Sequence, residues 1–315
     1  MTIGEREGRL ELSIAGSEVG RGTPGRLARL FQRSEAARHY ALLSPSIALL
    51  AFALTAPLGL LVLYSFWTQS GLELNRDFTL AQYESVLGRA FYRELFLRSV
   101  GISALVTVVT VALAYPMAYF VAFKVTKHKF VWLVLLSIPF WTSYLLRVFA
   151  WKVILGFNGV INSGLLSLGL ISQPLEFLLY NPTAVVITLA HTYAAFAILP
   201  IYVSLEKIDR SLLEAAADLG DGPVRRFLRV TLPLSLPGII GAAVLIFVPT
   251  TGDYVTPTLV GGADGVMIAN LIQVQFGRVN NWPLGAALAL ASMAAVGVLA
   301  VSVIQAVKLA TARIR

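Results

Sequence analysis

The chain has 315 residues, of which 57% are hydrophobic and only 13% are charged, and its formal net charge is +8. Soluble domains are typically about 45 to 50% apolar, so this composition excludes an ordinary soluble domain and favours a membrane protein. The basic residues are not gathered into one patch with interleaved aromatic residues, which excludes a nucleic-acid-binding face.

Residues 1–40 are mostly polar and lack the apolar stretch of a cleavable signal peptide, so we expect a cytoplasmic N-terminal segment there. Six apolar runs follow, each close to the roughly 20 residues that a helix needs to cross about 30 Å of hydrocarbon. They are Ala41–Trp67, Val100–Phe123, Phe130–Leu146, Pro182–Val203, Leu236–Tyr254 and Pro283–Val307. The third is the shortest and contains Pro139. The pattern predicts an all-α polytopic membrane protein with six transmembrane helices, whose membrane domain covers residues 41–307 and contacts membrane lipid.

The distribution of basic residues predicts the orientation of these spans. Of the 25 Lys and Arg residues, 18 lie in segments on the side that holds both termini, and 7 lie on the other side. Because Lys and Arg are enriched in cytoplasmic loops, both termini should be cytoplasmic, including the tail 308–315. The segment 205–231 is then the longest internal cytoplasmic loop.

Two short helices are expected in this loop. Ser211 is followed three residues later by Glu214, the spacing of a capping box that satisfies free amides at a helix start. The first helix would have one apolar side, made of Leu212, Ala215, Ala216 and Leu219. Such a short amphipathic helix is not stable alone in water and should need a groove to lie in.

The rest of the loop consists of helix-stop and helix-start residues. Gly220 can adopt the left-handed conformation that ends the first helix, and Pro223 suits the first turn of a second helix running toward Val230. We expect Thr231-Leu232-Pro233 to end that second helix.

The spacing of these residues resembles a family motif. In order, the loop contains Glu214-Ala215-Ala216, three intervening residues, Gly220, nine intervening residues and then Val230-x-Leu232-Pro233. This pattern is similar to the EAA motif of permease subunits of ATP-binding-cassette (ABC) importers, with Val230 where the family usually has Ile. Four stretches between Pro139 and Ala287 further resemble the spermidine/putrescine permease branch. They are PFWTSYLLR, LEKIDRSLLEAAADLG, GDYVTPTLVGG and NWPLGAA. Residues 1–38 lie outside the resemblance.

The resemblance implies a type I ABC importer permease fold in a bacterial inner membrane. It implies uptake of polyamines delivered by a periplasmic or lipid-anchored substrate-binding protein, together with a second permease subunit and an ATPase dimer. The first loop helix would be the coupling helix that docks into an ATPase cleft. The candidate coupling residues are Glu214, Ala215, Ala216, Gly220, Leu232 and Pro233. The alternative is that Ser211 and Glu214 only cap a helix.

No catalytic or metal-binding residues are expected in this chain. None of its lysines follows a glycine, so a G-x-x-x-x-G-K-[ST] phosphate cradle is missing, and ATP and magnesium should bind the partner ATPase. The three histidines are too scattered for a metal site. Because the chain has no cysteine, thiolate metal sites are excluded.

Other functions remain open at this point. They are an ABC importer permease for another small solute, such as an amino-acid-like or opine compound, and an ion-coupled secondary transporter, which would need coupling groups within its own spans. A membrane-embedded enzyme would need a catalytic motif that the chain lacks.

The outer part of the fifth run, Pro249–Tyr254, is the candidate substrate path because it combines proline, glycine and polar residues. Asp253 beside Tyr254 would suit an organic cation, through charge and cation–π attraction. The alternative places both residues at the headgroup boundary. Trp141 and Tyr144 are further path candidates. We nevertheless favour an interfacial anchoring role for these two, together with Arg147 and Trp151 just after them.

Overall fold

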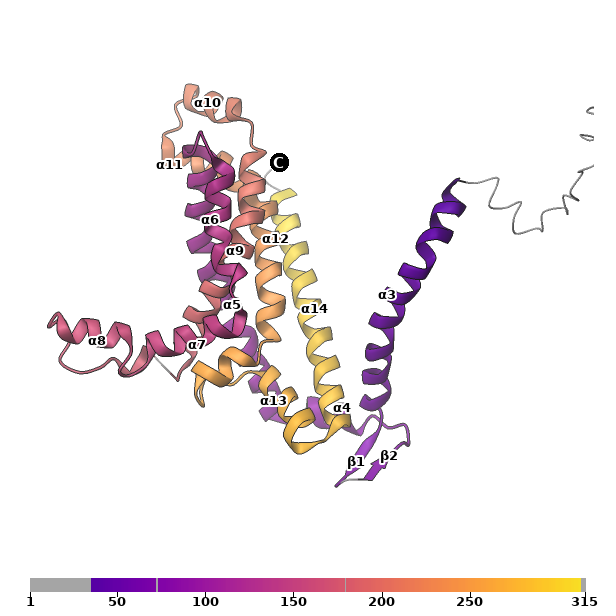
Figure 1. Cartoon of the computed structure of the whole chain (residues 1–315). Coiled ribbons are helices and arrows are strands. Elements are labelled where there is room, and N and C mark those ends of the chain that lie inside the picture. The colour runs from indigo at the N-terminus through magenta and orange to yellow at the C-terminus, as the bar shows by residue number, and fades with distance from the viewer. Residues whose placement is uncertain (1–34, 72, 179, 313–315) are drawn as a thin grey trace, which may run out of the picture. The chain divides into compact units, whose positions relative to one another are not determined.

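The computed structural model describes residues 35–71, 73–178 and 180–312 of the chain (Figure 1). The helices are α3 (Glu35–Ser65), α4 (Ala81–Gly88), α5 (Ala90–Tyr119), α6 (Lys129–Trp141), α7 (Tyr144–Leu155), α8 (Val160–Ser167), α9 (Pro182–Glu206), α10 (Arg210–Asp218), α11 (Pro223–Arg226), α12 (Leu232–Thr251), α13 (Ile268–Val274) and α14 (Trp282–Ala312). Four π-helical turns and one 3-10 turn join or extend them: η1 (Phe120–Lys124), η2 (Glu176–Leu178), η3 (Phe227–Thr231), η4 (Pro257–Gly261) and η5 (Gln275–Val279). A short antiparallel hairpin, β1 (Thr68–Ser70) with β2 (Glu73–Asn75), is the one sheet among the described residues, and the sequence did not predict it.

The chain divides into two units, Met1–Leu60 and Leu61–Arg315. In the first unit the described part is helix α3, whose apolar stretch Leu42–Ser65 continues into the second unit and matches the first predicted span. Leu50 and Phe52 are each 70% exposed, as a lipid-facing helix would be. Of the predicted N-terminal segment 1–40, residues 1–34 lie outside the described residues, and the helix has already begun at Glu35.

Four long helical segments of the second unit confirm the second, fourth, fifth and sixth predicted spans. They are Ala90–Lys124, Pro182–Glu206, Pro223–Thr251 and Trp282–Ala306, each long and apolar enough to cross a membrane. The second begins earlier than the apolar run because the polar residues before Val100 continue the same helix.

The third predicted span, Phe130–Leu146, is wrong as a single helix. Helix α6 ends at Trp141, and α7 begins at Tyr144 after a two-residue break. Pro139 has no amide donor for the last turn of α6, and the Thr142 hydroxyl donates to the Pro139 carbonyl at 2.8 Å. Thirteen residues of helix span about 20 Å, which is less than the hydrocarbon thickness.

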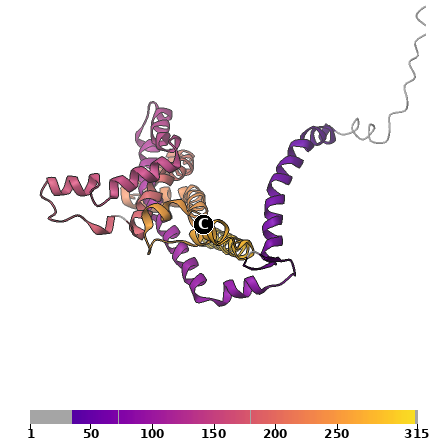
Figure 2. The ribbon, with the colours of Figure 1, turned by 60° about the horizontal axis from the view of Figure 1, so that its bottom comes forward.

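The contacts of α6 and α7 show how the chain crosses in this region. Lys129, at the start of α6, forms an ion pair with Glu206, at the end of α9, with 2.7 Å between nitrogen and oxygen. The chain must therefore return to the opposite end of the bundle before α9 begins at Pro182. Helices α7 and α8, together the candidate span Tyr144–Ser167, run across the direction of α5, α9 and α12 and project to one side of them (Figures 1 and 2).

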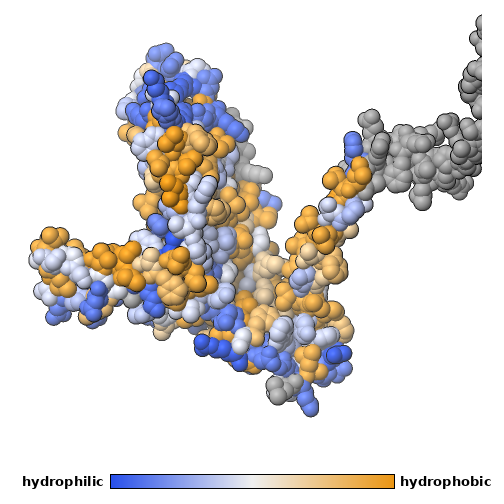
Figure 3. All heavy atoms as spheres, in the orientation of Figure 1, coloured by the Kyte–Doolittle hydropathy of each residue, from blue (hydrophilic) through white to orange (hydrophobic). Residues whose placement is uncertain are grey.

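The core of the second unit is formed by α5, α9 and α12. Buried apolar side chains from all three helices meet there, including Val106, Leu189, Ile201 and Ile246. Helices α9 and α12 approach closely at Gly238, where an added Cβ would lie 2.5 Å from the Pro200 carbonyl oxygen. On the outside, large apolar side chains are exposed along the bundle, while hydrophilic residues concentrate near α10 (Figure 3). This pattern fits a bundle surrounded by lipid or by partner helices.

Candidate functional site

The predicted coupling loop forms α10 and α11 at one end of the bundle (Figure 1). The residue that caps α10 is Asp209, whose side chain accepts a hydrogen bond from the Ser211 amide at 3.0 Å. This hydrogen bond lowers the pKa of Asp209 because it stabilises the carboxylate. The predicted Ser211–Glu214 capping box is therefore wrong: Ser211 already lies inside the first turn, and an aspartate two residues earlier takes the capping position.

Gly220 ends α10 as predicted. Its φ is +86°, in the left-handed region. The Gly220 amide donates to the Ala217 carbonyl at 2.9 Å and the Asp221 amide donates to the Ala216 carbonyl at 3.0 Å. This pair of bonds is a Schellman motif, which satisfies carbonyls left free at the helix end.

The second loop helix begins at Pro223 as predicted, but it does not end at Thr231-Leu232-Pro233. The chain continues through the π-helical turn η3 into α12, so Pro223–Thr251 is one long helical segment. Pro233, which lacks an amide donor, comes directly after the π-helical turn η3, where the regular α-helical hydrogen-bond pattern is interrupted. Leu232 and Pro233 therefore connect the loop rigidly to the membrane helix.

Helix α10 exposes part of its predicted apolar side. Ala216 is buried. Arg226, the last residue of α11, donates to the Leu213 carbonyl at 3.5 Å, which attaches α10 to α11. Leu212 is 47% exposed and Leu219 is 88% exposed, and Ala215 and Glu214 are also exposed. Exposed apolar side chains on a short helix are the arrangement that helix-in-groove recognition uses.

A second group of candidate residues meets where two helices break. Asp253 follows the end of α12, and its Oδ1 accepts from the amides of Val255 and Thr256 at 2.8 and 3.4 Å, which caps the next helical segment. Its Oδ2 accepts a hydrogen bond of 2.5 Å from the hydroxyl of Tyr144, the first residue of α7. The Tyr144 hydroxyl also lies 2.7 Å from Thr256 Oγ1. Asp253 and Tyr144, 109 positions apart, thus form one polar cluster, in which Asp253 is buried and Tyr144 is partly buried.

The other two predicted path residues lie outside this cluster. Trp141 is 82% exposed, and Tyr254 is 46% exposed, with its carbonyl accepting from Asn270 Nδ2 at 2.8 Å. Within the described part of the chain, neither side chain contributes a hydrogen bond to Asp253. Thr256 is the cluster residue that sequence reasoning missed, although its position three residues after Asp253 is the spacing of a helix cap.

Arg147 and Trp151, for which the sequence favoured an interfacial role, both contact α9. Arg147 donates to the Thr192 carbonyl at 3.3 Å, and Trp151 packs edge-on against His191 with 5.4 Å between ring centroids. Thr192 lies ten residues after the start of α9, about 15 Å along the helix, and the interfacial role of the two α7 residues stays a prediction. Among the described residues, no three His, Asp or Glu side chains gather as a metal site would require.

The long apolar helices and their end loop are those of a polytopic membrane protein. Residues 97–309 match the family model for the binding-protein-dependent transport system inner membrane component, and the chain belongs to this family. It is thus a permease subunit of an ABC transporter and a multi-pass protein of the inner membrane, as the EAA motif predicted.

Its relatives include the spermidine/putrescine transport system permease protein PotB. The Escherichia coli (strain K12) protein is 39% identical over 210 residues, which cover 67% of this chain and 76% of the relative. The Haemophilus influenzae protein of the same name is 34% identical over 242 residues, which cover 76% and 84%. The inner membrane ABC transporter permease protein YdcU of Escherichia coli (strain K12) is 32% identical over 232 residues, which cover 70% and 73%.

The fold is shared with a solved structure of a bacterial alginate ABC transporter in complex with an alginate pentasaccharide-bound periplasmic protein. The TM-score is 0.66 at 16% identity, and the match covers 83% of this chain and 91% of the other. Identity at this level establishes the fold alone.

Proposed function

We propose that this permease imports polyamines, using energy from a separate ATPase that binds the α10–α11 loop. The observation that carries the ATPase part is the exposed apolar side of α10, a helix of nine residues that is too short to be stable alone. Its Asp209 cap and its Gly220 stop fix its two ends, which prepares it for a groove on another chain.

The proposed orientation places α10 and both termini in the cytoplasm, in agreement with the 18 of 25 basic residues on that side. ATP and magnesium would then bind the partner ATPase. A second permease subunit would complete the membrane path, and a periplasmic or lipid-anchored binding protein would deliver the substrate at the opposite end. A clamp-like closure of the ATPase dimer would move α10, and with it the membrane helices.

The polyamine substrate is supported by the name that the Escherichia coli and Haemophilus influenzae PotB relatives share, and by the Tyr144–Asp253 cluster. Three oxygens gather there, because Tyr144 Oη lies within hydrogen-bond distance of both Asp253 Oδ2 and Thr256 Oγ1. A protonated primary amine has three donors and a positive charge, so it matches three acceptors of which one is anionic. The carboxylate is buried, and its charge would attract a cation more strongly than an exposed carboxylate would.

The experiment uses the whole transporter, reconstituted in liposomes with its partners, and measures uptake of labelled spermidine and putrescine. Asp253→Asn keeps the shape of the side chain but removes its charge, and we expect it to lower uptake about tenfold or more, because hydrogen bonds to charged groups contribute about 1.5–3 kcal/mol. Asp264→Asn, at an exposed aspartate, is the matched control. Unchanged polyamine uptake by an assembled Asp253→Asn complex would contradict a substrate role for the cluster.

Arg147 favours a second candidate substrate class, a solute that carries a carboxylate. Its Nε is buried without a partner among the described residues, while its NH1 binds the Thr192 carbonyl. A guanidinium with free donors inside the bundle suits an amino-acid-like or opine compound. In the same liposomes, competition by such a compound at the expense of polyamine uptake would favour this class. Membership of the binding-protein-dependent family gives an ion-coupled secondary transporter no support.

A further inference from the structure

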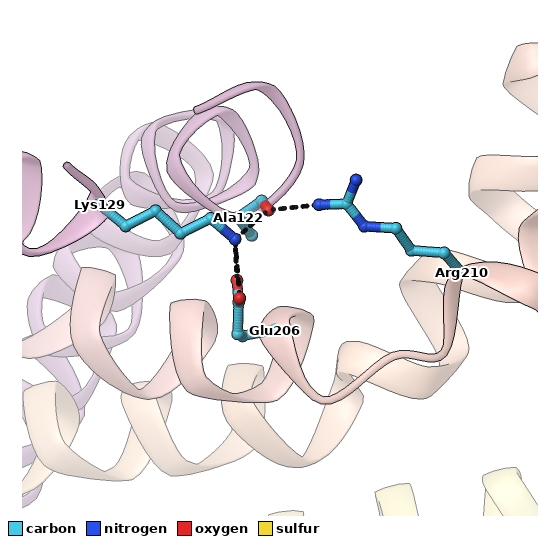
Figure 4. Close-up of polar contacts among 4 residues, drawn as sticks. All are labelled: Ala122, Lys129, Glu206 and Arg210. Atoms are coloured by element: carbon cyan, nitrogen blue, oxygen red, sulfur yellow. Dashed lines mark hydrogen bonds and ion pairs between the residues drawn. The ribbon is translucent and has the colours of Figure 1, made fainter. Parts of the chain in front are cut away.

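Two cations from different helices, Lys129 and Arg210, donate to one backbone carbonyl near the base of α10, and Glu206 of a third helix pairs with Lys129 (Figure 4). Lys129 Nζ binds both carboxylate oxygens of Glu206, at 2.7 and 2.9 Å, and donates to the Ala122 carbonyl at 3.1 Å. Arg210 donates to the same carbonyl from the other side, at 3.5 Å. The group joins the middle of η1, the start of α6, the end of α9 and the start of α10, and we call it the Ala122 tether.

Each charge stands at the unfavourable end of its own helix. Lys129 and Arg210 are the first residues of α6 and α10, where the helix dipole disfavours a cation, and Glu206 is the last residue of α9, where it disfavours an anion. None of these positions is explained by the local preferences of its own helix. Each is explained by the contact that the residue makes with another helix, and such departures from local rules are typical of functional positions.

The Ala122 carbonyl is available because η1 is the last turn of its helical segment. Carbonyls in a last turn have no amide partner within the helix, and cations stabilise them. The chain then turns back sharply through His128, whose φ of 60° is in the left-handed region, and this turn brings Lys129 back to Ala122. The sequence thus uses a strained residue to place a lysine on this carbonyl.

Helix α6 connects the tether to the polar cluster described above. Lys129 is its first residue, and Tyr144, which binds Asp253, follows its last residue by three positions. A second contact links α10 to α12. Arg226 of α11 donates to the Leu213 carbonyl of α10, and α11 continues into α12, which ends next to Asp253. A displacement of α10 therefore reaches the Tyr144–Asp253 pair from both sides, through α6 and through α12.

We infer that Lys129, Glu206 and Arg210 are positioning residues, which transmit the displacement of α10 through the Ala122 carbonyl and α6 to the Tyr144–Asp253 cluster. This inference rests on the proposed function, in which an ATPase moves α10. Cutting the tether should leave ATPase binding and hydrolysis in place while less substrate is transported for each ATP hydrolysed.

The test measures uptake per ATP in the reconstituted full complex, together with ATPase retention. We expect Lys129→Gln and Arg210→Gln to lower uptake per ATP at least fivefold with the ATPase retained, and Lys129→Arg to stay near wild type because it keeps both the ion pair and the donor. Lys127→Gln, at an exposed cation of the same turn, is the matched control and should be unchanged.

A charge exchange separates the tether from mere packing. The double variant Lys129→Glu with Glu206→Lys can restore an ion pair between α6 and α9, but a glutamate at 129 cannot donate to the Ala122 carbonyl. We expect it to recover thermal stability relative to either single variant without recovering uptake per ATP. Full recovery of uptake per ATP would show that the ion pair alone matters and would overturn the tether.

Two further results would overturn the inference. One is uptake per ATP within twofold of wild type for both Lys129→Gln and Arg210→Gln, and the other is loss of the ATPase from both variants, which would make them docking residues. If Lys129→Gln does not assemble, Arg210→Gln decides, since it leaves the Lys129–Glu206 pair intact. Failure of the proposed function is distinguishable, because the wild-type complex itself would then show no ATP-driven uptake.

Discussion

The clearest test of the coupling loop is a change of backbone freedom at Gly220. Its φ of +86° is one that side chains with a Cβ rarely adopt, yet a Cβ added there would meet no atom within 4 Å. Gly220→Ala therefore introduces strain without a steric clash. Because Gly220 is exposed and lies outside the membrane spans, we expect the six spans to insert normally.

The magnitude follows from the cost of the left-handed conformation, which is about 1–2 kcal/mol for a residue with a Cβ. If the ATPase binds only the form of α10 that ends in this turn, the strain opposes binding. Since 1.4 kcal/mol corresponds to tenfold in affinity, Gly220→Ala should weaken ATPase binding by roughly 5- to 30-fold. Asparagine tolerates the left-handed region better, so Gly220→Asn should weaken binding less. Gly220→Asp adds a charge at the turn and should be the most severe.

The assay is titration of the purified ATPase against permease complexes in nanodiscs, with substrate-stimulated ATP hydrolysis as a second readout. The expected order of affinity is glycine, asparagine, alanine and aspartate, from strongest to weakest. Equal affinities for the glycine, asparagine and alanine forms would refute the argument that the left-handed turn prepares α10 for docking. Gly222→Ala, at an exposed glycine with a negative φ, is the matched control.

The remaining predictions concern packing, orientation and the polar cluster. Gly238→Ala should destabilise the bundle by about 1–3 kcal/mol through overpacking against α9, whereas Gly241→Ala, which meets no atom within 4 Å, should not; thermal unfolding in detergent compares them. Because the chain has no cysteine, Asp77→Cys and Gly222→Cys can be labelled without background. An impermeant thiol reagent should reach the first but not the second in intact cells, and the reverse would contradict the orientation. Tyr144→Phe removes a hydrogen bond to a carboxylate, an interaction of about 1.5–3 kcal/mol, and should lower uptake without loss of the ATPase; normal uptake would argue against the cluster.

Local chemistry explains why much of this protein could be read from its sequence. Five of the six predicted spans are long helices because an apolar run of sufficient length has one stable form in a membrane, with every backbone group bonded inside the helix. Gly220 and Pro223 were also assigned correctly, since a left-handed stop and a first-turn proline depend on only a few neighbouring residues.

Tertiary structure decided the positions where local signals compete or where distant segments meet. At the start of α10, both Asp209 and Ser211 could cap, and the path of the chain out of α9 gave the position to Asp209. At Leu232–Pro233, the sequence suggested a helix end, but the π-helical turn η3 allowed the helix to continue into the core with α5 and α9. The break between α6 and α7 lies inside an apolar run. A hydropathy pattern shows that the run is apolar but not where its helix changes direction.

The pairings of functional side chains were also decided by the tertiary structure. No spacing in the sequence connects Tyr144 with Asp253, or Lys129 with Glu206, because these partners are 109 and 77 residues apart. The sequence by itself determined which segments are helices in the membrane and which loop carries the motif. Only the tertiary structure determined which polar groups of those segments meet, because each partner lies on a different helical segment that packing brings into reach.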